Sequence, residues 1–203
     1  MEHKLPPILP GNFYHLHNKS SGHQKLFATD ENYHFFLEKY KHFMGSIADT
    51  YAYVLMPEHF HFLVKIKPEG ELVKYFSKNR QKLDEYDTMI TEQLTELFNT
   101  YSKSFNKKQN HKGDLFLPQV KRKKIVDPEY LKNLARYMHY EPVEAGLVKH
   151  VYKYEHSSYN ALLNGDSNII SNAALYELFN DQESFIAFHE TNPKDFHYNF
   201  MNE

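Results

Sequence analysis

The segment from Tyr53 to Ile66 constrains the fold most, because histidine alternates with apolar residues in its second half. From Phe60 onward it is rich in aromatic and β-branched residues, which favour a β-strand. Side chains alternate across a strand, so His59 and His61 share one face while the apolar residues share the other. The apolar face predicts packing against a core, and two imidazoles that point the same way can bind one divalent metal ion. A purely structural pair fits the same spacing, since the chain contains 14 histidines.

Length and composition limit the class of protein. The 203 residues suit one domain with its own core, with or without an appended subdomain. The absence of cysteine excludes disulfides and thiolate metal ligands and fits a reducing cytosol. No apolar run approaches the roughly 20 residues of a membrane-spanning helix, and the polar N-terminus is unlike a signal peptide. We therefore expect a soluble, cytoplasmic protein without a membrane partner.

Charge is distributed unevenly along the chain. The net charge is −2, but residues 165–203 contain seven acidic residues and one lysine, which leaves +4 for residues 1–164. Between Lys103 and Lys124, eight Lys and Arg residues accompany a single acidic residue, Asp114. A local basic patch favours phosphate binding more than the total charge does. The last four basic residues, 121–124, could instead form an exposed strand edge that contacts only solvent. The expected DNA-binding residues are Lys107, Lys108, Lys112, Lys121, Arg122, Lys123 and Lys124.

The order of the expected elements indicates an α+β fold. Residues 13–18 and 51–55 have the composition of short strands, and apolar residues after the N-cap candidate Asp30 recur with helical spacing. Strand, helix, strand and strand in this order open a ferredoxin-like antiparallel sheet with helices on one face. In such a sheet His59 and His61 lie on the other face or at its margin, where a substrate can reach them.

A second pair of histidines lies in the first expected strand. His15 and His17 repeat the spacing of the later pair. The residues around them do not resemble a metal-binding motif. We therefore expect them to be structural or to face DNA.

The second half of the chain is expected to be mainly helical. Asp127 and Pro128 predict a helix start, because Asp is a good N-cap and Pro is tolerated in the first turn. The helix is expected to end at about Tyr140, before Pro142. It carries three tyrosines whose spacing alone does not select a reactive one: Tyr130, Tyr137 and Tyr140. The other expected elements are helices over residues 71–86, 88–108, 173–179 and 183–189, and extended segments over 115–117 and 120–126.

Two blocks of the sequence resemble a known enzyme family. Residues 56–64, Met-Pro-Glu-His-Phe-His-Phe-Leu-Val, resemble the HUH motif (His, hydrophobic residue, His) of the IS200-like tyrosine transposases, especially the REP-associated branch. Residues 137–148, Tyr-Met-His-Tyr-Glu-Pro-Val-Glu-Ala-Gly-Leu-Val, resemble the family's YIxxNPVxAGLV block. Weaker matches lie within 101–116 and 151–159. The resemblance covers about residues 10–160 and predicts a catalytic domain over 1–164, followed by an acidic, helical C-terminal extension over 165–203.

The resemblance implies a metal-dependent transposase, that is, a single-stranded DNA endonuclease and strand transferase. In this family the first tyrosine of the second block is the nucleophile, which selects Tyr137. The polar residue four positions later helps to hold the metal, so Mg²⁺ or Mn²⁺ would be bound by His59, His61 and Glu141. Attack on DNA would leave a 5′-phosphotyrosine and a free 3′-hydroxyl. The expected partner is single-stranded DNA that forms hairpins.

One departure from the family leaves two other functions open. Glu141 stands where the family usually has Asn or Gln, although a carboxylate also suits either metal. His59, His61 and Glu141 also satisfy the 2-His-1-carboxylate set of non-haem iron enzymes, which would make Tyr137 dispensable. The substitution at Glu141 further fits a DNA-binding protein of the same fold that has lost catalysis. The acidic tail has no motif, and we expect it to pack on the domain or to mediate self-association, as in a homodimer.

Overall fold

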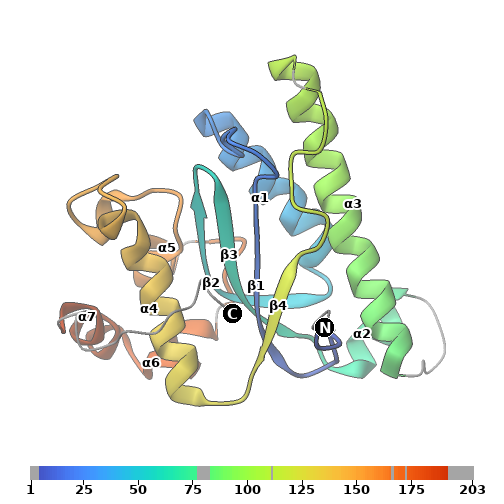
Figure 1. Ribbon diagram of the computed structural model, residues 1–203. Helices are drawn as coiled ribbons and strands as arrows, with labels where there is room; N and C mark the ends of the chain where they lie inside the picture. The colour runs from blue at the N-terminus through green and yellow to red at the C-terminus, as the bar shows by residue number, and fades with distance from the viewer. Residues whose placement is uncertain (1–4, 77–82, 111, 166, 172, 192–203) are drawn as a thin grey trace.

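Four antiparallel strands form the centre of the molecule (Figure 1). The computed structural model describes residues 5–76, 83–110, 112–165, 167–171 and 173–191. The strands are β1 (Phe13–Lys19), β2 (Ala48–Met56), β3 (His59–Ile66) and β4 (Lys121–Ile125), in the order β2-β3-β1-β4. This is the strand order of a ferredoxin-like sheet, so the expected fold class is confirmed.

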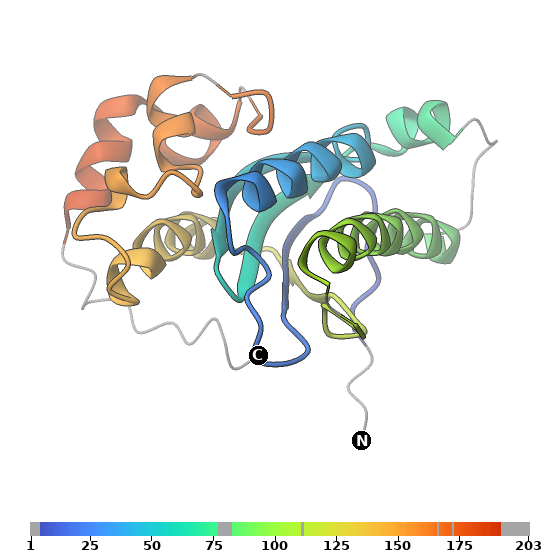
Figure 2. The ribbon, with the colours of Figure 1, turned by 90° about the horizontal axis from the view of Figure 1, so that it is seen from above.

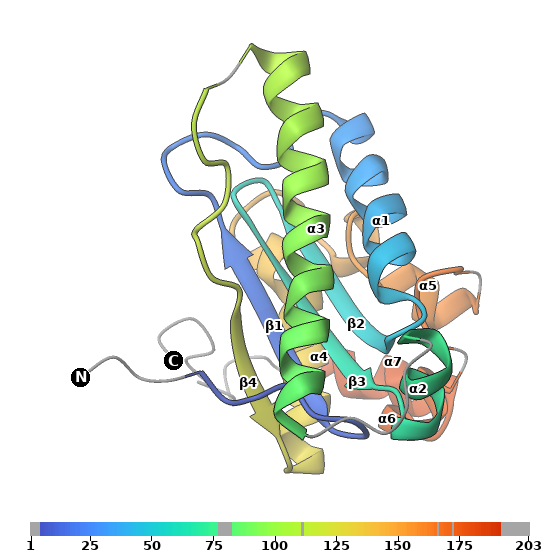
Figure 3. The ribbon, with the colours of Figure 1, turned by 90° about the vertical axis from the view of Figure 1, so that its right-hand side faces the viewer.

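Helices α1 (Asp30–Met44) and α3 (Leu83–Gln109) cover one face of this sheet (Figure 3). The rings of Phe60 and Phe62 lie 5.2 Å and 6.4 Å from the ring of Phe36 on α1, and Phe60 lies 5.8 Å from Phe98 on α3. These aromatic contacts form the centre of the core. They also confirm the strand alternation, since they leave the histidines of β3 on the opposite face.

Helix α4 (Pro128–Glu144) lies on that opposite face and contacts β2, β3 and β4. Seen from above, α4 is grouped with the C-terminal helices and apart from α1 and α3 (Figure 2). The Asp127 carboxylate accepts a hydrogen bond from the backbone N–H of Glu129 over 3.0 Å, as expected for the N-cap. The histidine face is therefore partly covered by the helix that carries Tyr137 and Glu141.

Several expected boundaries are wrong. The N-cap of α1 is Thr29 rather than Asp30. The helix expected over 71–86 is α2 (Glu69–Phe76) followed by the start of α3, and residues 77–82 lie outside the described part. Helix α3 runs through the expected break near residue 87, since no proline or glycine interrupts it there.

The most consequential boundary is the C-terminus of α4. The helix continues past Pro142 to Glu144, and the backbone N–H of Ala145 still bonds to the carbonyl of Glu141 over 2.9 Å. A proline this close to the end of a helix removes only one of the few intrahelical hydrogen bonds that remain. Glu141 is therefore helical and lies one turn after Tyr137.

The described part of the C-terminal region packs on the domain. It contains a short 3-10 helix, Val151–Lys153, and helices α5 (Tyr159–Asn164), α6 (Ala174–Phe179) and α7 (Gln182–Glu190). The backbone N–H of Ser171 bonds to the carbonyl of Thr50 on β2 over 2.8 Å. The Tyr140 hydroxyl of α4 donates to the carbonyl of His189 on α7. The division at residue 164/165 stays a prediction. None of the helices within the described ranges combines the length and the apolar character needed to cross a membrane.

A buried pair of histidines joins α7 to α4. Nδ1 of His139 lies 2.9 Å from Nε2 of His189, and Nε2 of His139 lies 2.8 Å from the Ser158 hydroxyl. Burial and the nearby Arg136 charge lower the pKa of His189 to about 4, although its bond to the Phe185 carbonyl opposes them. Burial, reinforced by His189, also lowers the pKa of His139 well below its usual range.

These pKa values predict acid-sensitive stability. The pKa of His189 is about 4 in the folded protein and about 6.5 in the unfolded chain. Between these two pH values the unfolded chain therefore binds more protons than the folded protein does. The free energy of unfolding therefore falls as pH decreases through that window, by up to about 3 kcal/mol for His189 alone. Urea titrations of wild type and His189→Gln at several pH values measure this. We expect a shallower pH slope for the variant, and equal slopes would contradict the assignment.

Candidate active site

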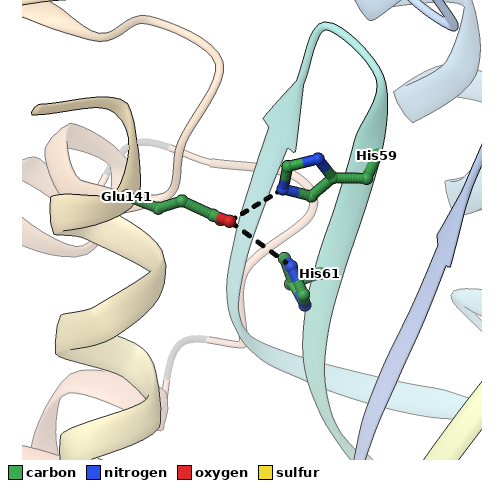
Figure 4. Close-up of side chains that lie close together, drawn as sticks. All are labelled: His59, His61 and Glu141. Carbon is green, nitrogen blue, oxygen red and sulfur yellow. Dashed lines mark hydrogen bonds and ion pairs between the residues drawn. The ribbon is translucent and has the colours of Figure 1, made fainter. Parts of the chain in front are cut away.

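The candidate metal ligands come from two elements that pack together. Strand β3 contributes His59 and His61, and α4 contributes Glu141, which points toward both imidazoles (Figure 4). Nε2 of His59 donates a hydrogen bond to Oε1 of Glu141 over 2.7 Å, and Nε2 of His61 lies 3.7 Å from the same oxygen. The three ligand atoms all lie within 4.8 Å of one another. The structure thus brings together the three side chains that the sequence singled out.

Two buried atoms of this cluster support metal binding. Nε2 of His61 and Oε2 of Glu141 have no hydrogen-bond partner within the described part of the chain. Leaving a buried polar atom unpaired costs about 1–3 kcal/mol, and a divalent cation would satisfy both atoms. The carboxylate suits Mg²⁺ or Mn²⁺, whereas the two imidazoles also suit first-row transition metals such as iron and zinc. The residues therefore fit a divalent metal, and the donor set does not select the ion.

The carboxyl group of Glu141 is ionised in these surroundings. Burial would raise its pKa, but the hydrogen bond from His59 and the closeness of both imidazoles outweigh burial and lower the pKa to about 2. Glu141 is therefore a negatively charged ligand throughout the neutral pH range.

Tyr137 lies beside the same carboxylate. Its hydroxyl donates a hydrogen bond to Oε1 of Glu141 over 3.2 Å, and its ring meets the ring of His61 edge-on at 6.0 Å between centroids. Residues four apart on a helix are neighbours on one face, so the continuation of α4 through Pro142 produces this contact. One oxygen atom thus contacts the candidate nucleophile and both histidines.

The electrostatics of Tyr137 keep its phenol protonated. Burial raises its pKa above the usual range, and the charge and hydrogen bond of Glu141 raise it further. A cation bound between His59, His61 and Glu141 would offset that negative charge.

The other two tyrosines of α4 point elsewhere. The Tyr140 hydroxyl reaches α7, as described above. The ring of Tyr130 lies 4.6 Å from the ammonium group of Lys123 on β4.

The pleat of β4 places its four basic residues, 121–124, alternately on the two faces of the sheet. Lys121 pairs with His17 and Lys123 pairs with His15, so both lie on the face of the metal cluster. Lys121 also lines a small pocket next to His59 and His61. Lys124 is exposed and belongs to the other face.

Arg122 occupies an internal position on the α3 side. Its guanidinium donates to the Pro6 carbonyl over 2.7 Å and to the Thr91 hydroxyl over 3.0 Å, and it lies 3.1 Å from the Asp87 carboxylate. With 9% of its side chain exposed, Arg122 serves the fold, and we leave it out of the proposed DNA surface.

The remaining basic residues lie at the end of α3 and in the loop that follows it. Lys107 and Lys108 lie in the last turn of α3, where Lys108 approaches Glu31 of α1 to 3.4 Å. Lys112 is exposed in the loop that follows. The structure does not bring these three into the metal cluster, and their contact with DNA stays a prediction.

His15 was not assigned to the site from the sequence. Its Nε2 lies 2.8 Å from Nδ1 of His61, and both rings are buried. The repeated histidine spacing in β1 was the available signal. Its meaning depends on the register of β1 against β3, which the sequence does not reveal.

Comparison with known proteins supports the fold. No protein-family model matches this sequence, and a search of curated proteins finds no match. A solved structure of a REP-associated tyrosine transposase bound to a REP hairpin is similar, with a TM-score of 0.55 and 16% sequence identity. The similarity covers 85% of this chain and 89% of that chain. This chain therefore has a fold similar to that of a hairpin-bound transposase and a His-His-Glu cluster compatible with metal binding.

Proposed function

We propose that this protein is a metal-dependent single-stranded DNA endonuclease and strand transferase with Tyr137 as its nucleophile. The observation that carries the proposal is the shared oxygen of Glu141, which contacts Tyr137 and His59 and lies 3.7 Å from His61. Phosphoryl transfer depends on positioning the nucleophile beside positive charge, and this arrangement can provide both. The hairpin-bound neighbour supports hairpin-forming single-stranded DNA as the substrate class.

Each residue of the site would have a separate role in this reaction. His59, His61 and Glu141 would hold the metal, and bound Mg²⁺ or Mn²⁺ would supply positive charge that stabilises charge developing on the phosphate. The Tyr137 oxygen attacks phosphorus, and its new bond replaces the bond to the 3′-oxygen. The phenolic proton passes to solvent, and the departing 3′-oxygen takes a proton from solvent. The products are a 5′-phosphotyrosine and a 3′-hydroxyl, which can rejoin by the reverse step.

A cleavage assay on hairpin-bearing single-stranded DNA tests this function. With DNA labelled 3′ of the cut and Mn²⁺ present, we expect a nicked product and a labelled band that migrates with the protein on a denaturing gel. EDTA should abolish both. Tight DNA binding without cleavage would instead support the non-catalytic DNA-binding protein. Cleavage without the protein-linked band would indicate a hydrolytic nuclease.

The split basic run gives a prediction for DNA binding. Replacing Lys121 and Lys123 by alanine should weaken binding, because both lie on the face of the metal cluster. Binding without these two phosphate contacts releases fewer counterions from the DNA. The slope of log K against log salt should therefore flatten by about 1.4 for single strands, or about 0.7 for each contact. Fluorescence anisotropy at several salt concentrations measures the slope.

A matched control separates local contact from total charge. Lys39 and Lys41 lie on α1, which covers the opposite face of the sheet. Replacing both by alanine removes the same charge and should leave the slope close to that of wild type. Equal flattening in the two double variants would contradict a phosphate-binding surface on β4.

A further inference from the structure

We infer that His15 is a positioning residue for the metal site, because it orients His61 through a hydrogen bond between the two rings. The inference rests on the metal binding that forms part of the proposed function. It goes further by assigning a role to a residue outside the metal-binding cluster.

Strand pairing brings the two histidines together. Strand β1 lies beside β3, with His17 opposite His61 and His15 opposite Leu63. His15 is therefore diagonal to His61 on the same face of the sheet. Nε2 of His15 lies 2.8 Å from Nδ1 of His61, and the two residues are 2% and 1% exposed. Buried rings in such contact have little freedom to turn.

The hydrogen bond decides which nitrogen of His61 can bind a metal. A neutral imidazole has a proton on one nitrogen and a lone pair on the other. Nε2 of His61 lies next to Glu141, so metal binding there requires the proton to be on Nδ1. That proton must then be donated to Nε2 of His15. The reverse arrangement, with His15 donating, would put the proton of His61 on Nε2 and block the ligand position.

This selection changes no net charge, because it only exchanges the protonated nitrogen within each ring. Such outer-shell partners fix the ring and the proton of a metal-bound histidine, and losing one typically costs about 10- to 100-fold in metal affinity. His17 provides a contrast. Its ring packs 5.3 Å from that of His61, whereas the hydrogen-bond partner of Nδ1 of His61 is Nε2 of His15.

Mn²⁺ affinity without DNA is the direct measurement. Isothermal titration with MnCl₂ compares wild type, His15→Leu, His15→Gln and His17→Gln, with thermal unfolding as a check on folding. We expect His15→Leu to bind Mn²⁺ about 10- to 100-fold more weakly, since leucine fills space without accepting a hydrogen bond. His15→Gln should recover most of the affinity, because its amide oxygen can accept from Nδ1 of His61. His17→Gln should bind nearly as wild type does.

The outcomes separate this inference from the proposed function. Absence of Mn²⁺ binding by folded wild type would refute the metal site itself. Wild-type affinity in folded His15→Leu, or equal losses in His15→Leu and His15→Gln, would overturn the role of His15. If His15→Leu does not fold, ¹⁵N NMR of metal-free wild type decides, because without a metal only the protein fixes the proton of His61. A proton on Nδ1 of His61 supports the inference, and a proton on Nε2 overturns it.

Discussion

Replacing Glu141 by alanine should lower Mn²⁺ affinity by more than about 100-fold, because it removes a direct ligand rather than an outer-shell partner. DNA cleavage should be lost with it. Glu141 approaches both histidines and accepts the hydrogen bond of Tyr137 through one oxygen, so the substitution removes a ligand and frees the nucleophile from its position. Titration with MnCl₂ and the hairpin cleavage assay measure the two effects separately.

Glu141→Gln is the matched variant. It keeps the length and one oxygen of the side chain but removes its charge, so it should bind Mn²⁺ more weakly than wild type and better than Glu141→Ala. Glu141→Asn should also keep some activity, since Asn or Gln is usual in the family block that this segment resembles. Glu141→Ala with unchanged Mn²⁺ affinity would exclude this carboxylate as a metal ligand.

Tyr137→Phe should lower the cleavage rate by more than about 10⁴-fold, as expected for the loss of a nucleophile. The change removes only the hydroxyl, whose hydrogen bond goes to Glu141. The fold, Mn²⁺ affinity and DNA affinity should therefore stay close to those of wild type. Single-turnover cleavage, Mn²⁺ titration and anisotropy of labelled DNA measure these quantities on the same preparation.

Two tyrosines on the same helix serve as controls. Tyr130→Phe keeps the ring beside Lys123, and Tyr140→Phe loses a hydrogen bond to the carbonyl of His189 at a cost of about 1 kcal/mol. Both should keep cleavage activity. Loss of cleavage in Tyr140→Phe together with normal cleavage in Tyr137→Phe would contradict this assignment, because it would make Tyr140 the nucleophile.

Local patterns in the sequence were enough to predict the sheet. The alternation after His59 defined a two-faced strand, and the order of strands and helices indicated the ferredoxin-like arrangement that the structure has. Asp127 and Pro128 correctly located the start of α4, because capping depends on neighbouring residues.

Features that depend on distant residues were not predictable in this way. The role of Arg122 is set by Asp87, 35 positions earlier on α3. The contact of His15 with His61 depends on strand register over 46 positions. The convergence of Tyr137 and Glu141 on β3 was implied by family resemblance, and their contact also required α4 to continue through Pro142. Strand pairing and helix packing supplied what local spacing could not.

The central claim is that the Tyr137 oxygen forms a covalent bond to DNA. The most direct test is to trap the adduct from wild type, digest the DNA and the protein, and map the modified residue by mass spectrometry. Trypsin should release residues 137–149, which contain both Tyr137 and Tyr140, and fragment ions distinguish the two. We expect a nucleotide linked through its 5′-phosphate to Tyr137. A nucleotide on any other residue, or Mn²⁺-dependent cleavage without a modified peptide, would contradict the claim.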